Sequence, residues 1–209
     1  MGSGPAALAG SILEVDLTTG ESNCLPSGPY AADYLGGRGM AARLAWERIT
    51  PGMRPFDERA PLLVMTGALV GTPSPSAGRV VISGLSPQAH PQEWYTRSNL
   101  GGFFGAELKY AGYDGLVVVG RAPRLSYLWI EDERVSLRDA EHLRGLGMHG
   151  TQRALEQELG EGVRVLAIGP AGENRVRYAV VGTNTESVAG QGGFGAVLGA
   201  KNLKAVAVR

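Results

Sequence analysis

Two glycine-rich segments of this chain repeat one another, and the repeat constrains the fold more than any other feature of the sequence. Each segment runs Gly-Gly-Phe, a spaced Gly-Ala, a short helical piece with a basic residue and an apolar strand. They are GGFFGAELKYAGYDGLVVVGR at 101–121 and GGFGAVLGAKNLKAVAVR at 192–209. A polar loop precedes each. Unless the likeness arose by chance, two such turns related by a twofold axis would present similar backbone surfaces side by side.

The glycine content supports close approaches of the backbone. Glycine accounts for 32 of 209 residues, about twice its usual share of roughly 7%. The hydrophobic content of 44% excludes a disordered glycine-rich chain. A folded chain of this kind uses glycine in tight turns and wherever the backbone approaches a ligand or another segment closely. The length predicts one domain or two small ones.

Hydrophobic periodicity predicts an α+β fold in which most strands are antiparallel. Alternating apolar residues predict strands, including 12–17 before a hairpin turn at Thr19-Gly20 and a final strand in 203–209. Helices are expected within 28–49, interrupted by the glycines of 36–39, and in 147–160. The polar stretch 88–99 predicts a loop, and 175–182 predicts a strand. We expect a flexible segment at 1–11 and a single domain at 12–209.

Charge and hydropathy exclude several classes of partner. The 20 basic residues balance the 20 acidic ones, so we expect no nucleic acid and no anionic membrane surface as partners. No apolar run approaches the roughly 20 residues of a membrane span. The N-terminus lacks the basic region and apolar run of a signal peptide. A cytoplasmic location is therefore expected.

Few side chains suggest catalysis or metal binding. Cys24 is the single cysteine, so the sequence offers neither a disulfide framework nor a cysteine cluster site. His90, His142 and His149 are far apart and lack metal-ligand spacing. No pair of carboxylates and no Ser/His/Asp or Cys/His set emerges, so the sequence predicts no catalytic constellation of its own.

The glycine turns leave two interpretations open. Each turn lies at a helix start, where unpaired backbone N–H groups and the helix dipole favour a phosphate. Neither turn is a P-loop, because no Gly-Lys-Ser/Thr follows. Gly190–Gly195 matches G-x-G-x-x-G, but the acidic ribose ligand expected about 20 residues later is missing. The alternative is tight packing in a crowded core; as a pair, the turns favour a phosphate or pyrophosphate.

Two side chains near these segments also allow two interpretations. Asn99 precedes the first glycine turn and could be a helix cap or turn former. Its amide oxygen would also suit a hard cation such as Mg²⁺ between phosphates. Arg79 could be a surface arginine or a clamp for an anion or cofactor.

Four ordered stretches resemble the signature stretches of one family, the tungsten-containing aldehyde ferredoxin oxidoreductases. The resemblance is to their amino-terminal domain and runs from about Ile12 to Arg209. The stretches are TGALVGTPSPSAGR, SNLGGFFGAELKYAGYDGLVVVGRA, AIGPAGENRVRYAVV and AGQGGFGAVLGAKNLKAVAV.

The resemblance implies a fold and a cofactor. In the family, this domain is similar to two mostly antiparallel β-sheets related by a pseudo-twofold axis, with a few short helices. It forms the base on which a bis-pterin tungsten or molybdenum cofactor rests. A Mg²⁺ ion bridges the pterin phosphates, and its protein ligands correspond to the Asn99 side chain and the Val188 carbonyl. Arg79 takes the place of an arginine between the pterin and an iron–sulfur cluster. The backbone positions that face the phosphates correspond to Gly101, Gly102, Gly190 and Gly192.

The sequence departs from the family at two positions near the phosphates. Family members often carry arginine where this chain has Ser187 and Gln191, so positive charge is lost there. Gln191 can still donate a hydrogen bond as a neutral partner. The cysteines that bind the [4Fe–4S] cluster and the helical domains that cover the pterin have no counterpart in this chain.

The resemblance therefore implies part of an enzyme that oxidises an aldehyde to a carboxylate and passes electrons to ferredoxin. The expected partners are the cluster-binding helical domains, or a subunit made of them. Without these domains the pterin-binding face would be exposed, so a homodimer is also expected. The alternative is a non-catalytic module that carries the pterin cofactor or assists its assembly. A dinucleotide-binding protein is the weaker third possibility.

Overall fold

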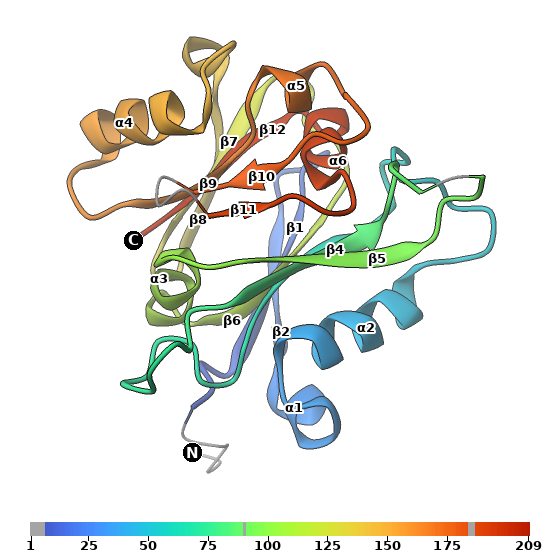
Figure 1. Cartoon of the computed structure of the whole chain (residues 1–209). Helices are drawn as coiled ribbons and strands as arrows, with labels where there is room; N and C mark the ends of the chain where they lie inside the picture. Colours follow the sequence, from blue (N-terminus) through green and yellow to red (C-terminus); the bar gives the residue numbers. More distant parts are fainter. Residues whose placement is uncertain (1–6, 90, 184–186) are drawn as a thin grey trace.

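The chain folds into two halves with the same order of strands. The structure is a computed structural model that describes residues 7–89, 91–183 and 187–209. Within these residues each half forms one mixed sheet of six strands (Figure 1). The strand order is β2-β1-β6-β3-β4-β5 in the first sheet, called sheet A, and β8-β7-β12-β9-β10-β11 in the second, called sheet B. Adding six to each strand number of sheet A gives the corresponding strand of sheet B.

The first half contains two helices on one face of its sheet and a third before its last strand. Its elements are β1 (Ser11–Asp16), β2 (Ser22–Pro26), α1 (Gly28–Tyr34), α2 (Gly37–Arg48), β3 (Leu62–Thr66), β4 (Val80–Leu85), β5 (Tyr95–Leu100), α3 (Phe104–Tyr110) and β6 (Tyr113–Val119).

The second half repeats this plan with shorter strands at its edge. Its elements are β7 (Ser126–Glu131), β8 (Arg134–Asp139), the 3-10 helix η1 (Glu141–Leu143), α4 (Met148–Leu159), β9 (Arg164–Ala167), α5 (Pro170–Glu173), β10 (Val181–Gly182), β11 (Val188–Ala189), α6 (Phe194–Ala200) and β12 (Leu203–Val208).

Most neighbouring strands are antiparallel, and each sheet contains one parallel pair. In sheet A, β6 lies parallel to β1, and in sheet B, β12 lies parallel to β7. The remaining pairs among the described strands are antiparallel. Each parallel strand follows a glycine turn and a short helix, which return the chain to the first strand of its half. The expected α+β class and the paired sheets are confirmed.

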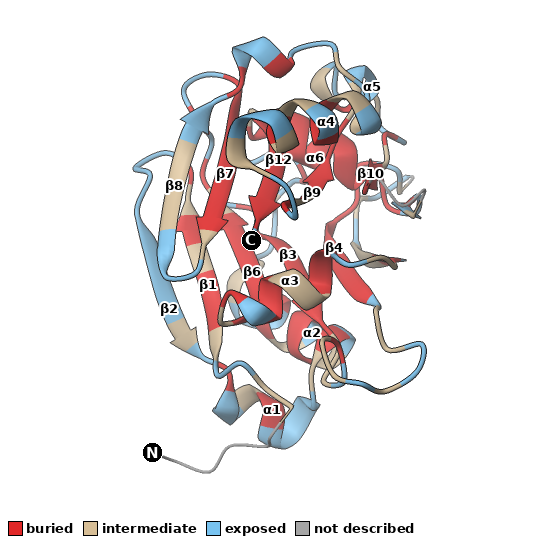
Figure 2. Ribbon diagram, turned by 90° about the vertical axis from the view of Figure 1, so that its left-hand side faces the viewer, coloured by how far each residue is buried: buried red, intermediate tan, exposed pale blue. Residues whose placement is uncertain are grey.

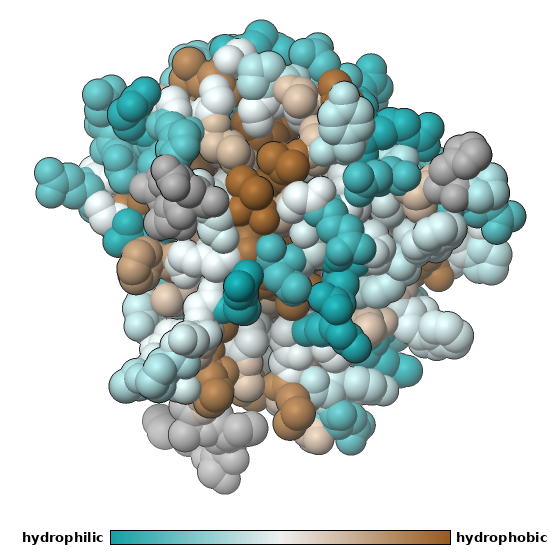
Figure 3. Space-filling model, in the orientation of Figure 1, coloured by the Kyte–Doolittle hydropathy of each residue, from teal (hydrophilic) through white to brown (hydrophobic). Residues whose placement is uncertain are grey.

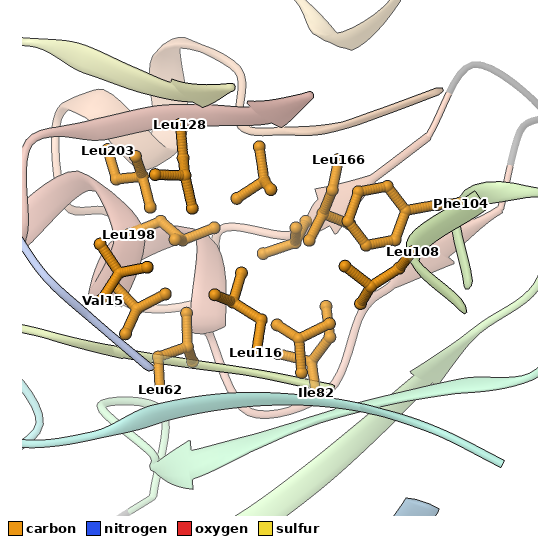
Figure 4. Close-up of a cluster of buried hydrophobic side chains, with 14 of the residues drawn as sticks. Val15, Leu62, Ile82, Phe104, Leu108, Leu116, Leu128, Leu166, Leu198 and Leu203 are labelled. Carbon is orange, nitrogen blue, oxygen red and sulfur yellow. The ribbon is translucent and has the colours of Figure 1, made fainter. Parts of the chain in front are cut away.

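The core lies between the two sheets because successive strand residues point to opposite faces. Figure 4 shows leucine and isoleucine side chains of both sheets in one cluster, including Leu62 and Leu116 of sheet A and Leu128 and Leu166 of sheet B. Phe104 of α3 joins this cluster, as does Phe194 of α6. The alternate residues of each strand point to the outer face of its sheet. They pack under α1 and α2 on sheet A and under α4 on sheet B. In Figure 2 the central strands are buried, while β2 exposes most of its residues and β8 half of them.

Two local predictions from the sequence are wrong. The stretch 88–99, expected to be a loop, contains most of β5. The stretch 175–182, expected to be a strand, contributes only Val181–Gly182 to β10. The predicted interruption of the first helical region is confirmed, because α1 ends at Tyr34 and α2 begins at Gly37. Leu35 and Gly36 between them have φ values of 63° and 158°.

Candidate functional site

The two glycine turns occupy equivalent positions in the two halves. Each leads into a seven-residue helix that begins Phe-Gly-Ala, α3 at Phe104 and α6 at Phe194. Two residues before each phenylalanine lies a glycine with positive φ, Gly102 at 90° and Gly192 at 87°. Since glycine adopts this conformation without the steric cost that a Cβ imposes, both turns use it at this position. The next residue differs, because Phe103 has a φ of −99° and Gly193 one of 67°.

The fold brings the two turns together at the edges of the sheets. β5 is the outer strand of sheet A and β11 that of sheet B, and they lie side by side (Figure 1). Two hydrogen bonds join the segments. The Gly101 N–H donates to Ser187 Oγ at 2.6 Å, and the Gln191 N–H donates to Ser98 Oγ at 3.2 Å. Residues 86 and 93 positions apart therefore form one surface.

Asn99 lies in β5, opposite Val81 of β4, and its side chain is exposed. Its face of sheet A is the one that α2 covers, because Met65, which pairs with Val81, packs under α2. The helix-cap interpretation of Asn99 is wrong. Phe103 is the N-cap residue of α3, and no side-chain bond caps this helix. The amide of Asn99 is thus placed at the surface beside the glycine turn.

Val188 lies in β11, and the hydrogen-bond pattern directs its carbonyl. The Thr183 N–H donates to the Ser187 carbonyl at 3.1 Å. Alternate pairs of an antiparallel ladder exchange hydrogen bonds, so the next pair, Gly182 and Val188, is a non-bonded one. The Val188 carbonyl oxygen therefore points away from β10, toward the side on which β5 lies. This orientation would allow it to serve as a ligand.

Arg79 precedes β4 at the end that meets the first glycine turn. The register pairs Val80 with Leu100, which places Arg79 beside Gly101. The neighbouring Gly78 confirms this proximity, because a Cβ built on it would lie 3.1 Å from the Gly102 carbonyl oxygen. Arg79 is exposed and shares its sheet face with Asn99. The structure thus gathers the predicted arginine, asparagine and glycines.

Further basic side chains border this surface. Arg97 lies two residues before Asn99 on the same face of β5. Burial raises the pKa of the Tyr95 hydroxyl, while its contact with Ser83 and the charges of Arg97 and Arg38 lower it. Arg38 lies in the first turn of α2. Because both arginines act on Tyr95, both lie close to this part of β5. Figure 3 shows hydrophilic side chains gathered in the middle of this face, over β4 and β5.

The glycines of the second turn fall into two groups. A Cβ on Gly195 would lie 2.4 Å from the Val180 carbonyl oxygen, and one on Gly199 would lie 1.8 Å from that of Gly172. Packing therefore requires these glycines. Gly190 has no positive φ, and a Cβ there would meet nothing within 4 Å. Its missing side chain leaves open space above the turn, where a ligand could approach the backbone.

The backbone donors of the turns also fall into two groups. The N–H groups of Gly101 and Gln191 bond to serine hydroxyls, and that of Gly192 donates to Gln88 Oε1 at 2.7 Å. Within the described part of the chain, the N–H groups of Gly102 and Gly190 have no acceptor. The latter two are therefore the donors best placed for an anion. The exposed side chain of Gln191 lies beside them.

No sequence pattern singles out Ser98 or Gln88. Both bond to backbone groups more than 90 residues away, so only the fold reveals their role. His90 lies outside the described residues, as does the segment 184–186. Among the residues described, no group of three or more His, Cys, Asp or Glu side chains could hold a metal ion. None of the described helices is long and apolar enough to cross a membrane.

Fold and site together define a class of protein, a domain of two equivalent halves whose glycine turns meet at the sheet edges. Residues 12–209 match the family model described as aldehyde ferredoxin oxidoreductase, N-terminal domain. The chain belongs to this family, as the expected resemblance indicated.

Similar proteins support this assignment. The tungsten-containing aldehyde ferredoxin oxidoreductase of Pyrococcus abyssi is 41% identical over 202 residues, which cover 96% of this chain and 33% of the relative. The aliphatic sulfonate oxidoreductase, WOR-like subunit, of Pyrococcus furiosus is 34% identical and is covered over 34% of its length. A solved structure, the active site complex BamBC of benzoyl coenzyme A reductase with 1,5-dienoyl-CoA, has a TM-score of 0.93 and 43% identity. The match covers 97% of this chain and 31% of the solved chain. The chain thus spans about a third of these relatives.

Proposed function

We propose that this chain is the cofactor-binding base of an aldehyde:ferredoxin oxidoreductase, as a domain or a subunit. The observation that carries the proposal is the meeting of two equivalent glycine turns beside Asn99 and the Val188 carbonyl. The bound bis-pterin tungsten or molybdenum cofactor would supply the two-electron oxidation of an aldehyde to a carboxylate, with a [4Fe–4S] cluster and ferredoxin as electron acceptors.

The residues present fit the phosphate end of such a cofactor. The Asn99 amide oxygen and the Val188 carbonyl oxygen are hard ligands that suit Mg²⁺. They would hold the ion that bridges two phosphates. The N–H groups of Gly102 and Gly190 would donate to phosphate oxygens. The open space at Gly190 supports this role, because packing within the chain does not require a glycine there.

Arg79 would supply a permanent positive charge beside the first turn. Its guanidinium stays protonated throughout the physiological range and can bind an anion with two parallel hydrogen bonds. Ser187 and Gln191 are neutral, so the second turn depends on backbone and amide donors. We therefore expect Arg79 to contribute more to anion binding than any side chain of the second turn.

Catalysis would require the part of the relatives that this chain does not span. A cofactor resting on one open surface is exposed to water. We therefore assign cofactor anchoring to this chain, and cluster binding and substrate binding to helical domains or a partner subunit. Oxidation of aldehydes by the purified chain alone, with a dye as acceptor, would contradict this division.

Metal content provides the test. The chain would be produced in a host that synthesises the pterin, together with the cluster-binding region, and analysed for tungsten, molybdenum and iron. We expect Asn99→Ala to reduce the tungsten or molybdenum content at least several-fold. The control Asn23→Ala, on the exposed strand β2, should leave it unchanged. Equal cofactor content in both variants would exclude Asn99 as the Mg²⁺ ligand.

A pterin carrier or assembly module is the second candidate, favoured by the neutral Ser187 and Gln191 at the second turn, where relatives often carry arginine. A carrier would acquire the cofactor without the cluster-binding region and release it to an acceptor protein. Retention of the cofactor only when both parts are present would support the enzyme instead.

A further inference from the structure

Two serines bind across the boundary between the halves in a reciprocal manner. Ser98 of the first half accepts the N–H of Gln191 in the second, and Ser187 of the second accepts the N–H of Gly101 in the first. Gly101 and Gln191 each lie three residues before the phenylalanine that begins the following helix. The two bonds are therefore near-equivalents under the pseudo-twofold relation. We call this pair of bonds the serine clasp.

Each serine of the clasp directly precedes a proposed ligand of Mg²⁺. Ser98 precedes Asn99 in β5, and Ser187 precedes Val188 at the start of β11. Successive strand residues point to opposite faces. Ser98 thus points to the inter-sheet side that it shares with Leu100, while Asn99 points to the side that α2 covers. Ser98 therefore connects the halves without occupying the surface on which Asn99 lies, and Ser187 does so beside Gly101.

We infer that Ser98 and Ser187 are positioning residues that fix the separation of the two glycine turns, so that two phosphates and one bridging cation bind jointly. This inference rests on the proposed function. Asn99 and Val188 belong to different sheets, and no described β-ladder pairs β5 with β11. Within the described residues, the clasp links these two edges beside the bond from the Gly192 N–H to Gln88 Oε1, and its serines are the residues that directly precede both ligands.

The geometry also determines what the clasp should not affect. A single phosphate at one turn needs only the N–H groups of that turn, whose conformation its own glycines fix. Joint binding needs the two turns to be held at a fixed distance from each other. If this distance is no longer fixed, the effective concentration of the second site falls. Removal of the clasp should therefore weaken cation-bridged binding more than binding of a single anion.

The test uses the full chain with Mn²⁺ and inorganic phosphate as probes. Electron paramagnetic resonance would measure Mn²⁺ binding with and without phosphate for wild type, Ser98→Ala, Ser187→Ala and the double variant. A neutral hydrogen bond contributes on the order of 1 kcal/mol, which corresponds to about a fivefold change in affinity. We expect each single variant to weaken Mn²⁺ binding in the presence of phosphate about fivefold. Phosphate binding without metal should change much less, because a single phosphate does not depend on the spacing of the two turns.

Four controls separate positioning from a general structural role. Ser187→Thr keeps a hydroxyl and should restore wild-type binding, whereas Ser136→Ala, on the distant strand β8, should have no effect. Amide hydrogen exchange should accelerate at Gly101 in Ser187→Ala and at Gln191 in Ser98→Ala. Thermal unfolding would confirm that each variant is folded.

The outcomes distinguish this inference from the proposed function. If the alanine variants lose amide protection but bind Mn²⁺ with phosphate like wild type, while Asn99→Ala does not, the inference is wrong and the site stands. If wild type itself binds Mn²⁺ no more tightly with phosphate than without, and Asn99→Ala changes nothing, both are wrong. Weakened joint binding that Ser187→Thr restores would establish the clasp as a positioning device.

Discussion

At the residue scale, the glycines of the last 20 positions serve different purposes. Gly192 and Gly193 adopt positive φ, and Gly195 and Gly199 press against carbonyl groups of neighbouring segments. Gly190 alone among these five has neither constraint. Backbone conformation or packing thus accounts for four of these five glycines. A ligand that approaches the backbone would account for Gly190.

Substitution by alanine should separate these two kinds of glycine. Gly190→Ala should change the free energy of unfolding by less than about 0.5 kcal/mol, as for a surface substitution. Gly195→Ala should lower it by about 1–3 kcal/mol because its Cβ would overlap the Val180 carbonyl. Urea unfolding would measure both. Only Gly190→Ala should lose cofactor while remaining stable, and a cofactor content equal to wild type would contradict the proposed close approach.

Lys201 provides a prediction about pH. Its ammonium group is buried and donates to the carbonyls of Glu58 and Gly120 at 2.9 and 3.2 Å. Burial lowers the pKa of Lys201 from 10.5 to about 8, despite the opposing effect of nearby carboxylates. Between these values the unfolded chain binds more protons than the folded one. The contribution of Lys201 to stability should therefore rise from pH 8 to pH 10.5, by about 3 kcal/mol, and stay constant below pH 8.

The comparison with Lys201→Met isolates this effect from other groups that titrate in the same range. The difference in unfolding free energy between wild type and the variant should shift in favour of wild type as the pH rises above 8. Chemical unfolding at pH 6, 7, 9 and 10 would measure it. A difference that stays constant over this range would show that the lysine has an ordinary pKa.

At the element scale, the site depends on strands that the sequence identified least well. The apolar residues of β1 and β12 predict these strands, and α4 is predicted as well. β5 is polar because it is an edge strand that exposes Asn99, and such a segment has the composition of a loop. β10 and β11 contain two residues each, too few for any periodicity.

The candidate residues were nevertheless identified from the sequence, because the repeated glycine turns and the family stretches mark them without reference to strands. What the sequence could not supply were the partners across the halves. Ser98, Gln88 and Ser187 bond to residues 86 to 104 positions away. Such contacts depend on the relative placement of two sheets, which no local pattern encodes.

Asp114 connects several elements of the first half through β6. Its carboxylate accepts from the N–H groups of Ala9 and Gly10 and from the Ser27 hydroxyl, and it lies 3.5 Å from the Lys109 ammonium. Both side chains of this ion pair are buried. Since loss of one partner leaves a buried charge uncompensated, Asp114→Asn should lower the unfolding free energy by about 3–5 kcal/mol. Denaturant unfolding would measure this loss.

Asp139 offers a matched control for Asp114. It forms an ion pair with Arg124 at 3.1 Å, and both side chains are largely exposed. Asp139→Asn should cost less than about 1 kcal/mol because water screens the pair. Equal effects of the two substitutions would show that the buried pair contributes no more than a surface one.

At the scale of the whole molecule, the two halves bury their sheets against each other but leave apolar surface on the outer side of α2. Met40 and Leu44 pack on sheet A, while Trp46 is 81% exposed. Trp46 lines an apolar groove of about 620 Å³ that also includes Ile49 and Tyr95. Exposed apolar patches of this kind commonly mark contact surfaces. Because the relatives are about three times as long as this chain, we expect a partner region or a second copy to cover the groove.

The chain without its partner region should therefore self-associate through α2. Trp46→Lys places a charge in the groove and should weaken association at least tenfold, since burial of a large aromatic side chain contributes more than the 1.4 kcal/mol that a tenfold change requires. Sedimentation equilibrium would measure the dissociation constant. Tyr178→Lys is the control, because Tyr178 is 69% exposed but lies in the second half and does not line this groove. A strictly monomeric wild type would exclude self-association, and equal effects of both substitutions would place the contact elsewhere. If the cluster-binding region also binds wild type but not Trp46→Lys, self-association and partner binding would use the same surface, and the isolated chain would dimerise because its partner is missing.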